Sequence, residues 1–186
     1  MVKFGLLLGG IALSSALLVG CGSDTDSKAN DEKSNKTETV AKTDTKEKKV
    51  SFKNDTLTIN DAVIKLTGSE FADPNTEYGE DKPTLILTYD YTNTSKEAME
   101  PSTVFIACFG ATQETETTIE DLDIAMSPQD PKYAKMNEIG NTKVKPGATV
   151  STVISYEIKD KNTPITLTAS QGVMGDKLGT KTYQFK

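Results

Sequence analysis

The stretch PTLILTYDYTN, residues 83–93, decides the fold of this chain. Its large apolar and aromatic side chains recur at every second position, at Leu85, Leu87, Tyr89 and Tyr91. Such alternation is typical of a β-strand that buries one face and leaves the other in water. The stretch therefore predicts an antiparallel sheet with one solvated face.

The same period of two recurs towards the C-terminus, in ATVSTVISYEIKD (148–160) and ITLTAS (165–170). Turn-forming residues separate the candidate strands, for example Asn60-Asp61 and Pro146-Gly147, and Gly147 suits a turn position with positive φ. Seven or eight short strands at this spacing predict one β-sandwich domain over residues 50–186. The stretch 97–113 also tolerates a helix after Pro101, but we predict a strand there. The remaining expected strands are 56–60, 62–72, 102–110, 117–125 and 181–186.

Residues 1–20 read as a secretory signal peptide that is removed from the mature protein. Lys3 supplies a positive start, and an apolar run reaches to Val19. The run is too short for a membrane-spanning helix, which needs roughly 20 apolar residues.

The end of this signal carries a more specific pattern. Leu18, Val19, Gly20 and Cys21 resemble the lipobox of bacterial lipoproteins. The resemblance implies cleavage before Cys21 and a diacylglycerol on its thiol, which anchors the chain in the membrane. We therefore expect a lipid-anchored protein that faces the extracytoplasmic side of the cell membrane.

The segment that follows, residues 22–49, is almost free of apolar side chains and carries seven lysines and seven acids. Such a segment cannot bury enough surface to offset its ordering entropy, so we expect a disordered linker. A flexible coil of this length spans about 30 Å, which would carry the domain clear of the lipid headgroups. The chain is thus divided into a signal peptide (1–20), a lipidated cysteine with its linker (21–49) and a β-sandwich domain (50–186).

Composition excludes several kinds of function. The chain has no histidine, so Ser-His-Asp and Cys-His catalytic sites and imidazole-based zinc sites are impossible. All 21 basic residues are lysines, and residues 50–186 carry 13 lysines against 20 acids, a net charge of −7. An acidic domain without arginine argues against nucleic-acid binding. We expect no cofactor and no enzymatic activity.

Cys108 is the second of two cysteines, and it lies in the apolar stretch VFIACFGA. If Cys21 carries lipid, Cys108 has no partner for an internal disulfide. We predict that it is a buried and inert thiol.

A family resemblance rests on the lipobox and linker, on LTYDYTNTSKEA and ATQETE, and on VKPGATVSTVISYEIKDKNTPITL. With these features the chain resembles Gram-positive surface lipoproteins whose domain, of unknown function, is immunoglobulin-like and of the telokin-like secreted antigen type. The resemblance would cover residues 50–186. It implies a fold and a location, and it supplies no catalytic or ligand-binding residues.

Two sets of residues remain as weak site candidates. Tyr78 and Tyr133 lie in loop-like stretches, and loops on a rigid sandwich often bind partners, so both are candidate binding-loop residues. Glu120, Asp121 and Asp123 are the weak metal candidates, because clustered carboxylates suit hard cations such as Ca²⁺. A solvated acidic edge explains these three residues better, so we predict no metal site.

Together these observations predict a lipid-anchored binding module at the cell surface. The expected partner is a protein or a cell-wall component, and the domain itself is expected to be monomeric. The alternative is an accessory ligand-binding or sensing component of a membrane transporter.

Overall fold

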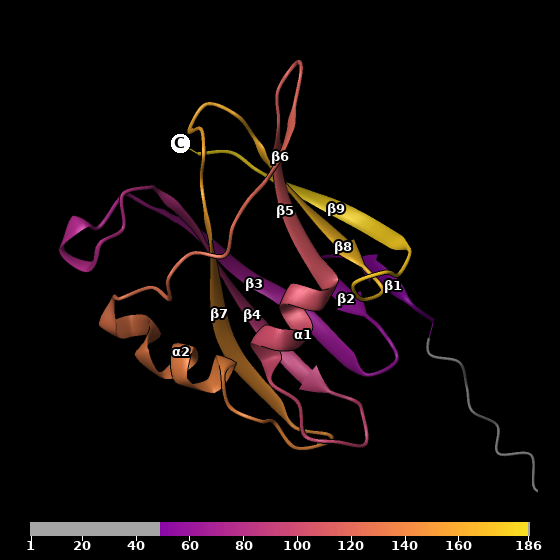
Figure 1. Cartoon of the computed structure of the whole chain (residues 1–186). Helices are drawn as coiled ribbons and strands as arrows, with labels where there is room; N and C mark the ends of the chain where they lie inside the picture. The colour runs from indigo at the N-terminus through magenta and orange to yellow at the C-terminus, as the bar shows by residue number, and fades with distance from the viewer. Residues whose placement is uncertain (1–48, 186) are drawn as a thin grey trace, which may run out of the picture. The chain divides into compact units, whose positions relative to one another are not determined.

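The computed structural model describes residues 49–185, and over this range the chain forms two antiparallel β-sheets (Figure 1). The first sheet has the strand order β1-β2-β3-β4-β7 and the second has the order β6-β5-β8-β9. The predicted β-sandwich is confirmed, with nine strands in the described range. They are β1 (Ser51–Lys53), β2 (Thr56–Thr58), β3 (Ala62–Ala72), β4 (Thr84–Asn93), β5 (Phe109–Glu114), β6 (Ile119–Asp121), β7 (Thr149–Glu157), β8 (Ile165–Ser170) and β9 (Lys177–Tyr183).

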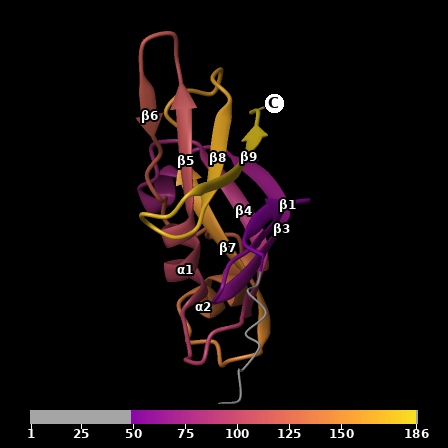
Figure 2. The ribbon, with the colours of Figure 1, turned by 90° about the vertical axis from the view of Figure 1, so that its right-hand side faces the viewer.

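Within residues 49–185, four short helical segments accompany the strands. Figures 1 and 2 show the hairpin of β5 and β6 projecting at one end of the domain, and α1 and α2 lying towards the other. The segments are the 3₁₀ helices η1 (Thr76–Tyr78) and η2 (Pro131–Tyr133) and the α-helices α1 (Pro101–Cys108) and α2 (Ala134–Gly140).

The core lies between the sheets, and β4 supplies its centre. Leu85, Leu87, Tyr89 and Tyr91 are all fully buried, as the alternation in residues 83–93 predicts. β4 pairs with β3 on one side and with β7 on the other, so its backbone is bonded along both edges. Burying such large side chains contributes roughly 1.5–3 kcal/mol each.

The strand predicted at 102–110 is wrong, because residues 101–108 form α1 and the strand begins only at Phe109. Pro101 occupies the first turn of α1, where its missing N–H costs no hydrogen bond. Phe105 then lies between Tyr89 and Phe109, with ring centroids 4.5 Å from each. The sequence pattern did not reveal α1, because apolar residues occupy both its buried face, with Phe105 and Cys108, and its exposed face, with Ile106. The helix therefore shows little separation of apolar and polar side chains.

Other strands also differ from the prediction. The strand expected at 117–125 is reduced to β6, because the chain leaves the second sheet after Asp121 and runs beside β7 instead. The strand expected at 181–186 is β9, which begins at Lys177. β1 was not predicted, and it pairs with β2 through a tight turn at Asn54 and Asp55, both with positive φ.

The outer face of the first sheet is less solvated than predicted. Ile86 and Val153 point away from the main core, and Tyr133 covers them to form a second small cluster. Met136 of α2 packs against this cluster. The segment formed by η2 and α2 thus covers part of the outer face of the first sheet, which the sequence alternation predicts to be exposed to solvent.

Asn93 ties the end of β4 to two loops. Its buried carboxamide nitrogen donates to the carbonyls of Glu97 and Val144, at 2.7 and 2.8 Å. The backbone carbonyl of Asn93 accepts a 2.7 Å hydrogen bond from the N–H of Gly147, whose φ is +79°. The positive φ expected at Gly147 is therefore confirmed, and Asn93 is a structural residue rather than a binding residue.

Candidate functional site

A cavity of about 140 Å³ lies beside β7, between α1, α2 and the segment 124–127. We name it the β7-edge cavity. β7 is the last strand of its sheet, so β4 pairs with only one of its edges. Three hydrogen bonds cover the other edge. The N–H of Glu157 donates to the Asp123 carbonyl and the N–H of Ala125 to the Ser155 carbonyl, both at 2.9 Å, and the Thr152 hydroxyl donates to the Met136 carbonyl at 2.8 Å. The cavity lies between the Ser155 and Thr152 contacts.

α2 forms one wall of this cavity because a glycine lets it approach β7 closely. A Cβ atom at Gly140 would lie 2.7 Å from the Thr152 hydroxyl oxygen, which is too short for any real contact. The close approach places Asn137 of α2, and Asn141 directly after it, in the cavity lining together with residues of α1. The Ser102 hydroxyl of α1 donates to Asn141 Oδ1 at 3.2 Å and so links the two helices.

Two polar atoms among the residues that line the cavity have no hydrogen-bond partner in the described structure. They are Ser155 Oγ, on a side chain that is only 2% exposed, and Asn137 Oδ1. The nitrogen of the same Asn137 carboxamide donates to the Pro128 carbonyl at 2.8 Å, which fixes the orientation of the group. Buried polar atoms are nearly always bonded, so these two oxygens are exceptions beside the cavity, but both are closed off from the solvent-accessible surface.

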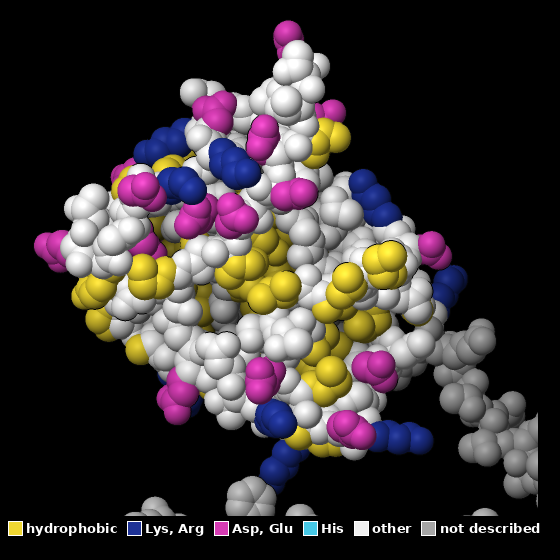
Figure 3. All heavy atoms as spheres, viewed as in Figure 1, with side chains coloured by type: hydrophobic (Ala, Val, Ile, Leu, Met, Phe, Trp, Pro, Cys, Tyr) yellow, Lys and Arg dark blue, Asp and Glu magenta, His cyan; other side chains and the backbone are white. Residues whose placement is uncertain are grey.

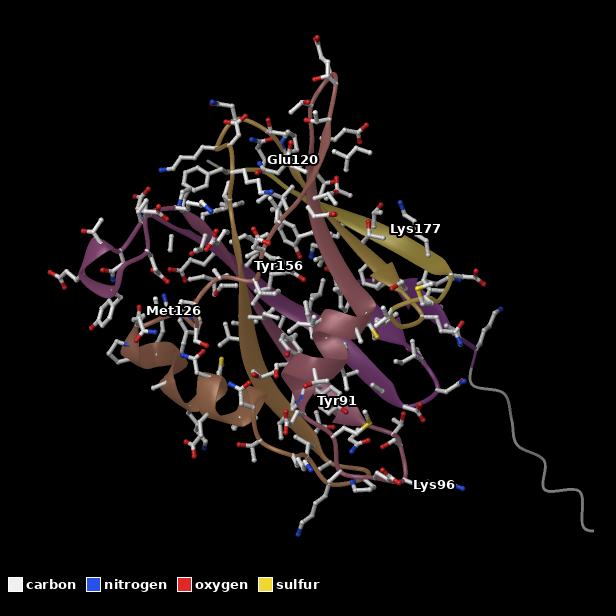
Figure 4. All side chains as sticks on the ribbon, in the orientation of Figure 1. Tyr91, Lys96, Glu120, Met126, Tyr156 and Lys177 are labelled. Atoms are coloured by element: carbon white, nitrogen blue, oxygen red, sulfur yellow. The ribbon has the colours of Figure 1, made fainter. Side chains whose placement is uncertain are left out.

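Exposed apolar side chains border the cavity. Ile106 of α1 is 51% exposed and Ile124 is 41% exposed, although both are large aliphatic residues. Met126 is also exposed and lies beside α2 (Figure 4). Figure 3 shows hydrophobic side chains gathered across the middle of this face, with most charged side chains around them. A solvent-facing apolar surface next to a cavity with polar lining residues is typical of a binding site.

Tyr133, a candidate binding-loop residue, is only 6% exposed and makes local contacts instead. Its hydroxyl donates to Glu70 Oε2 at 2.8 Å, and Lys132 Nζ lies 2.8 Å from the same oxygen. The hydrogen bonds from Lys132 and then Tyr133 hold the pKa of Glu70 below its ordinary value. Burial, and then the bond to Glu70, raises the pKa of Tyr133. This cluster fastens η2 to β3 and does not line the β7-edge cavity.

Tyr78, the other candidate, is 53% exposed at the end of η1. It does not line the β7-edge cavity, so the structure does not bring the two candidate tyrosines together at that site. Tyr78 stays a predicted contact residue.

The three acidic candidates do not form a common site. Glu120 lies near the base of the β5–β6 hairpin and pairs with Lys159 at 3.5 Å (Figure 4). Asp121 ends β6 opposite Thr112, and the Asp123 carbonyl accepts a bond from the N–H of Glu157. Within residues 49–185, no group of three or more Asp, Glu, Cys or His side chains is arranged to hold a metal ion.

Cys108 is buried at the end of α1, as predicted. Burial raises the pKa of its thiol, which disfavours the reactive thiolate. The predicted signal peptide, Leu18, Val19, Gly20, Cys21 and the linker up to residue 48 lie outside the described residues. No helix in the described part of the chain is long and apolar enough to cross a membrane.

Sequence reasoning missed the residues of the β7-edge cavity. Ser155 occupies one of the polar alternate positions of the stretch 148–160, and Asn137 lies in a segment without a clear pattern. One signal was present: Asn137, Gly140 and Asn141 have the i, i+3, i+4 spacing of one helix face. Only the position of α2 against β7 shows that this face meets Ser155.

Comparison with known proteins identifies the family. A family model described as "Domain of unknown function (DUF5067)" matches residues 23–171. No curated protein matches the chain. A solved "putative lipoprotein" from Staphylococcus aureus subsp. aureus NCTC 8325 is 19% identical, with a TM-score of 0.64 over 73% of this chain and 92% of that one.

A solved protein from Enterococcus faecalis is 16% identical, with a TM-score of 0.58 over 73% of this chain and 93% of that one. At these identities the similarity to both solved structures shows the shared fold alone. Because the family model covers most of the chain, this protein belongs to the DUF5067 family.

Proposed function

We propose that this protein is a lipid-anchored lipoprotein on the extracytoplasmic side of a Gram-positive cell membrane, and that its domain is a binding module. The pattern Leu18, Val19, Gly20 and Cys21 supports the anchor, as does the polar segment that follows it. The lipoprotein description of the Staphylococcus aureus structure points in the same direction.

The β7-edge cavity is the single observation that supports binding. It combines the exposed polar side chains of Ser127 and Asn141 with an apolar border formed by Ile106 and Ile124. Its lining contains no acidic, basic or thiol side chain, so it offers no acid–base pair and no activated nucleophile. This chemistry suits recognition better than catalysis.

The anchor is tested by the Cys21→Ser variant. We expect the unchanged protein to sediment with membranes and Cys21→Ser to be found in the soluble fraction, because the thiol that accepts the diacylglycerol is gone. Cys108→Ser is the matched control, and it should stay in the membrane fraction. A Cys21→Ser protein that remains membrane-bound to the same extent would disprove the anchor.

The binding role is tested by placing a photo-crosslinking amino acid at single exposed positions of the intact protein on cells. A crosslinker at Ile124 should give a defined adduct, because this side chain borders the cavity. Ile119 on β6, which is 67% exposed and does not line the cavity, is the matched control. No adduct at Ile124, or the same adducts from both positions, would contradict the proposal. An adduct with a transporter subunit would identify the partner as a transporter and favour the accessory role.

A further inference from the structure

The loop that joins β8 to β9, residues 171–176, presents two neighbouring apolar side chains to solvent. Val173 is 81% exposed and Met174 is 97% exposed, the highest values among the large hydrophobic side chains of the described residues. Single exposed apolar residues are common on soluble domains, but two neighbours at the end of one loop form an apolar point that solvent disfavours. We name these two residues the β8–β9 tip.

The backbone of the loop holds the tip outward. The N–H of Gln171 donates to the Asp176 carbonyl at 3.0 Å, and the N–H of Gly175 donates to the Gly172 carbonyl at 3.2 Å. The Ser170 hydroxyl donates to the same Gly172 carbonyl at 3.0 Å. A Cβ atom at Gly175 would collide with the Gln171 carbonyl, so the turn is tightly closed. The two apolar side chains therefore project from a compact turn and are not part of an open, unstructured loop.

The described chain begins on the same side of the domain as this loop. Phe52 of β1 packs on β9, where a Cβ atom at Gly179 would lie 3.0 Å from its ring, and Asp55 forms an ion pair with Lys181 at 2.9 Å. β1 and β9 therefore run in the same direction, and the residues before Phe52 lead back towards Lys177, where β9 begins. Figure 1 shows the start of β1 and the β8–β9 loop together on the right-hand side of the domain.

The charges beside the tip differ from those of the domain as a whole. Residues 49–53 and 170–178 carry three exposed lysines, Lys49, Lys53 and Lys177, and one exposed acid, Asp176. Residues 50–186 together carry a net charge of −7. Lysines close to a membrane surface are attracted to anionic lipids, and distant charges are screened by salt. A bilayer therefore meets less repulsion at these two segments than the net charge of the domain implies.

We propose, building on the lipid anchor above, that the β8–β9 tip inserts Val173 and Met174 into the surface of the bilayer that holds Cys21. A protein partner would need a pocket shaped for two side chains on a protruding turn. A fluid bilayer surface accepts apolar side chains without such a matched shape, and amphipathic segments flanked by lysines bind there.

The contact depends on the anchor for its strength. Two apolar side chains bury little surface, and even a single long acyl chain gives only marginal membrane binding. The 28 residues from Cys21 to Lys48 link the anchor to the described domain, so the tip meets the bilayer in an intramolecular step. A flexible linker gives such a step an effective concentration of about millimolar, at which a weak contact is sufficient.

This contact would also orient the domain. Lys177, beside the tip, and Met126, next to the β7-edge cavity, lie on opposite sides of the domain (Figure 4). With the tip on the bilayer, the side of the domain that carries Met126 faces away from the lipid. The contact would therefore leave that side open to a partner.

Tryptophan fluorescence tests the contact, because the chain contains no tryptophan of its own. The full-length lipidated protein with Met174→Trp is reconstituted into vesicles of phosphatidylcholine and phosphatidylglycerol. We expect its emission to lie at shorter wavelength than that of a solvent-exposed tryptophan and to be quenched when the lipids carry brominated acyl chains. Adding Val173→Ser to Met174→Trp should reduce the quenching, because half of the apolar tip is lost. Both positions are exposed, so these variants keep the core intact.

Ile119→Trp is the matched control in the same vesicles. Ile119 is 67% exposed on β6, where it pairs with Glu114 at the end of β5. Phe109, at the start of β5, pairs with Ala169 close to the β8–β9 loop. Ile119 and the tip thus lie at opposite ends of the second sheet, and the emission of Ile119→Trp should stay at long wavelength without quenching.

Flotation of the vesicles separates the contact from the anchor. If the protein floats with the vesicles but Met174→Trp is quenched no more than Ile119→Trp, the contact is wrong and the anchor stands. If the protein does not float, the anchor fails and the contact fails with it. A shift in Met174→Trp emission that follows protein density and is insensitive to brominated lipid would also overturn the inference, because the tip would then meet a second copy of the chain.

Discussion

The Tyr133 hydroxyl donates a 2.8 Å hydrogen bond to Glu70 Oε2, and this bond joins η2 to β3 across 63 residues of chain. Lys132 reaches the same carboxylate, so both side chains of η2 point at one residue of the sheet. α2 follows η2 directly and forms a wall of the β7-edge cavity. The Glu70 cluster therefore positions that wall.

Tyr133→Phe should lower the free energy of unfolding by about 1 kcal/mol, because it removes a hydrogen bond and keeps the buried ring. Urea denaturation followed by circular dichroism measures the change. Tyr78→Phe is the matched control, since Tyr78 is exposed, and its effect should stay within about 0.5 kcal/mol. Equal effects of the two substitutions would contradict the role given to Tyr133.

Glu70 predicts a pH dependence of stability. Its pKa is lowered below the ordinary value of 4.5, first by the hydrogen bond from Lys132. A lowered pKa in the folded state stabilises the fold above the unfolded-state pKa, and this contribution is lost as the pH falls through the folded-state pKa. The stability difference between the unchanged protein and Glu70→Gln should therefore be largest near neutral pH and shrink below about pH 4.5.

Urea denaturation midpoints measured from neutral pH down to about pH 3 test this dependence. Glu116→Gln is a matched control, because the Glu116 carboxylate makes no ion pair in the described residues. A Glu70→Gln difference that stays constant with pH would contradict the assignment.

Phe105→Ala should destabilise the domain by about 3–5 kcal/mol, because the ring is fully buried between Tyr89 and Phe109. Ile106→Ala, one position along α1 and half exposed, should change stability by only about 0.5 kcal/mol. Thermal and urea unfolding of both variants compare the two faces of α1. A reversed order would mean that α1 does not pack as described.

Gln113→Ala should cost about 2–3 kcal/mol, because this buried carboxamide makes four hydrogen bonds to the loop between β7 and β8. It donates to the carbonyls of Asp160 and Thr163, and it accepts from the N–H groups of Lys159 and Asp160. Hydrogen exchange should show faster exchange of those two N–H groups in the variant.

The control for this substitution is Gln129→Ala, on an exposed glutamine that bonds only within its own loop. It should leave both the stability and the exchange rates of the β7–β8 loop unchanged. Slow exchange that persists in Gln113→Ala would show that other groups hold the loop.

Two buried hydroxyl groups on β7 differ in whether they have a hydrogen-bond partner. The Thr152 hydroxyl bonds to the Met136 carbonyl, so Thr152→Val should cost about 1 kcal/mol. Ser155 Oγ has no partner in the described structure, so Ser155→Ala should leave stability unchanged or raise it slightly. A loss of 2 kcal/mol or more, on the order of an unsatisfied buried group, in Ser155→Ala would show that its hydroxyl is bonded within the fold.

The sequence predicts the strands in which one face is apolar and the other polar. It does not predict the segments whose structure depends on contacts with distant residues. Leu85 to Tyr91 alternate because one sheet face meets the core, so period two is visible in the letters alone. α1 was mistaken for a strand because buried aromatic residues suit either structure, and only the contact of Phe105 with Tyr89 selects the helix. Tyr133 was placed in a loop because its partner, Glu70, lies on a distant strand.

The β7-edge cavity could not be predicted from the sequence for the same reason. Ser155 and Asn137 each look like ordinary polar residues, and their significance depends on being buried at one place without partners. The predicted tyrosines and acids were chosen because their chemistry is visible in isolation. The structure assigns Tyr133 and Glu120 to local contacts instead.

The position of β7 next to β4 also constrains the order in which the domain can be completed. β4 is made early, but the strand that covers its second edge comes only after α1, β5, β6 and α2. A growing chain shortened before Thr149 would leave that whole edge of β4 unpaired, and open edges recruit other chains. The first sheet therefore closes only once β7 has been made, and until then the open edge of β4 can pair with neighbouring chains.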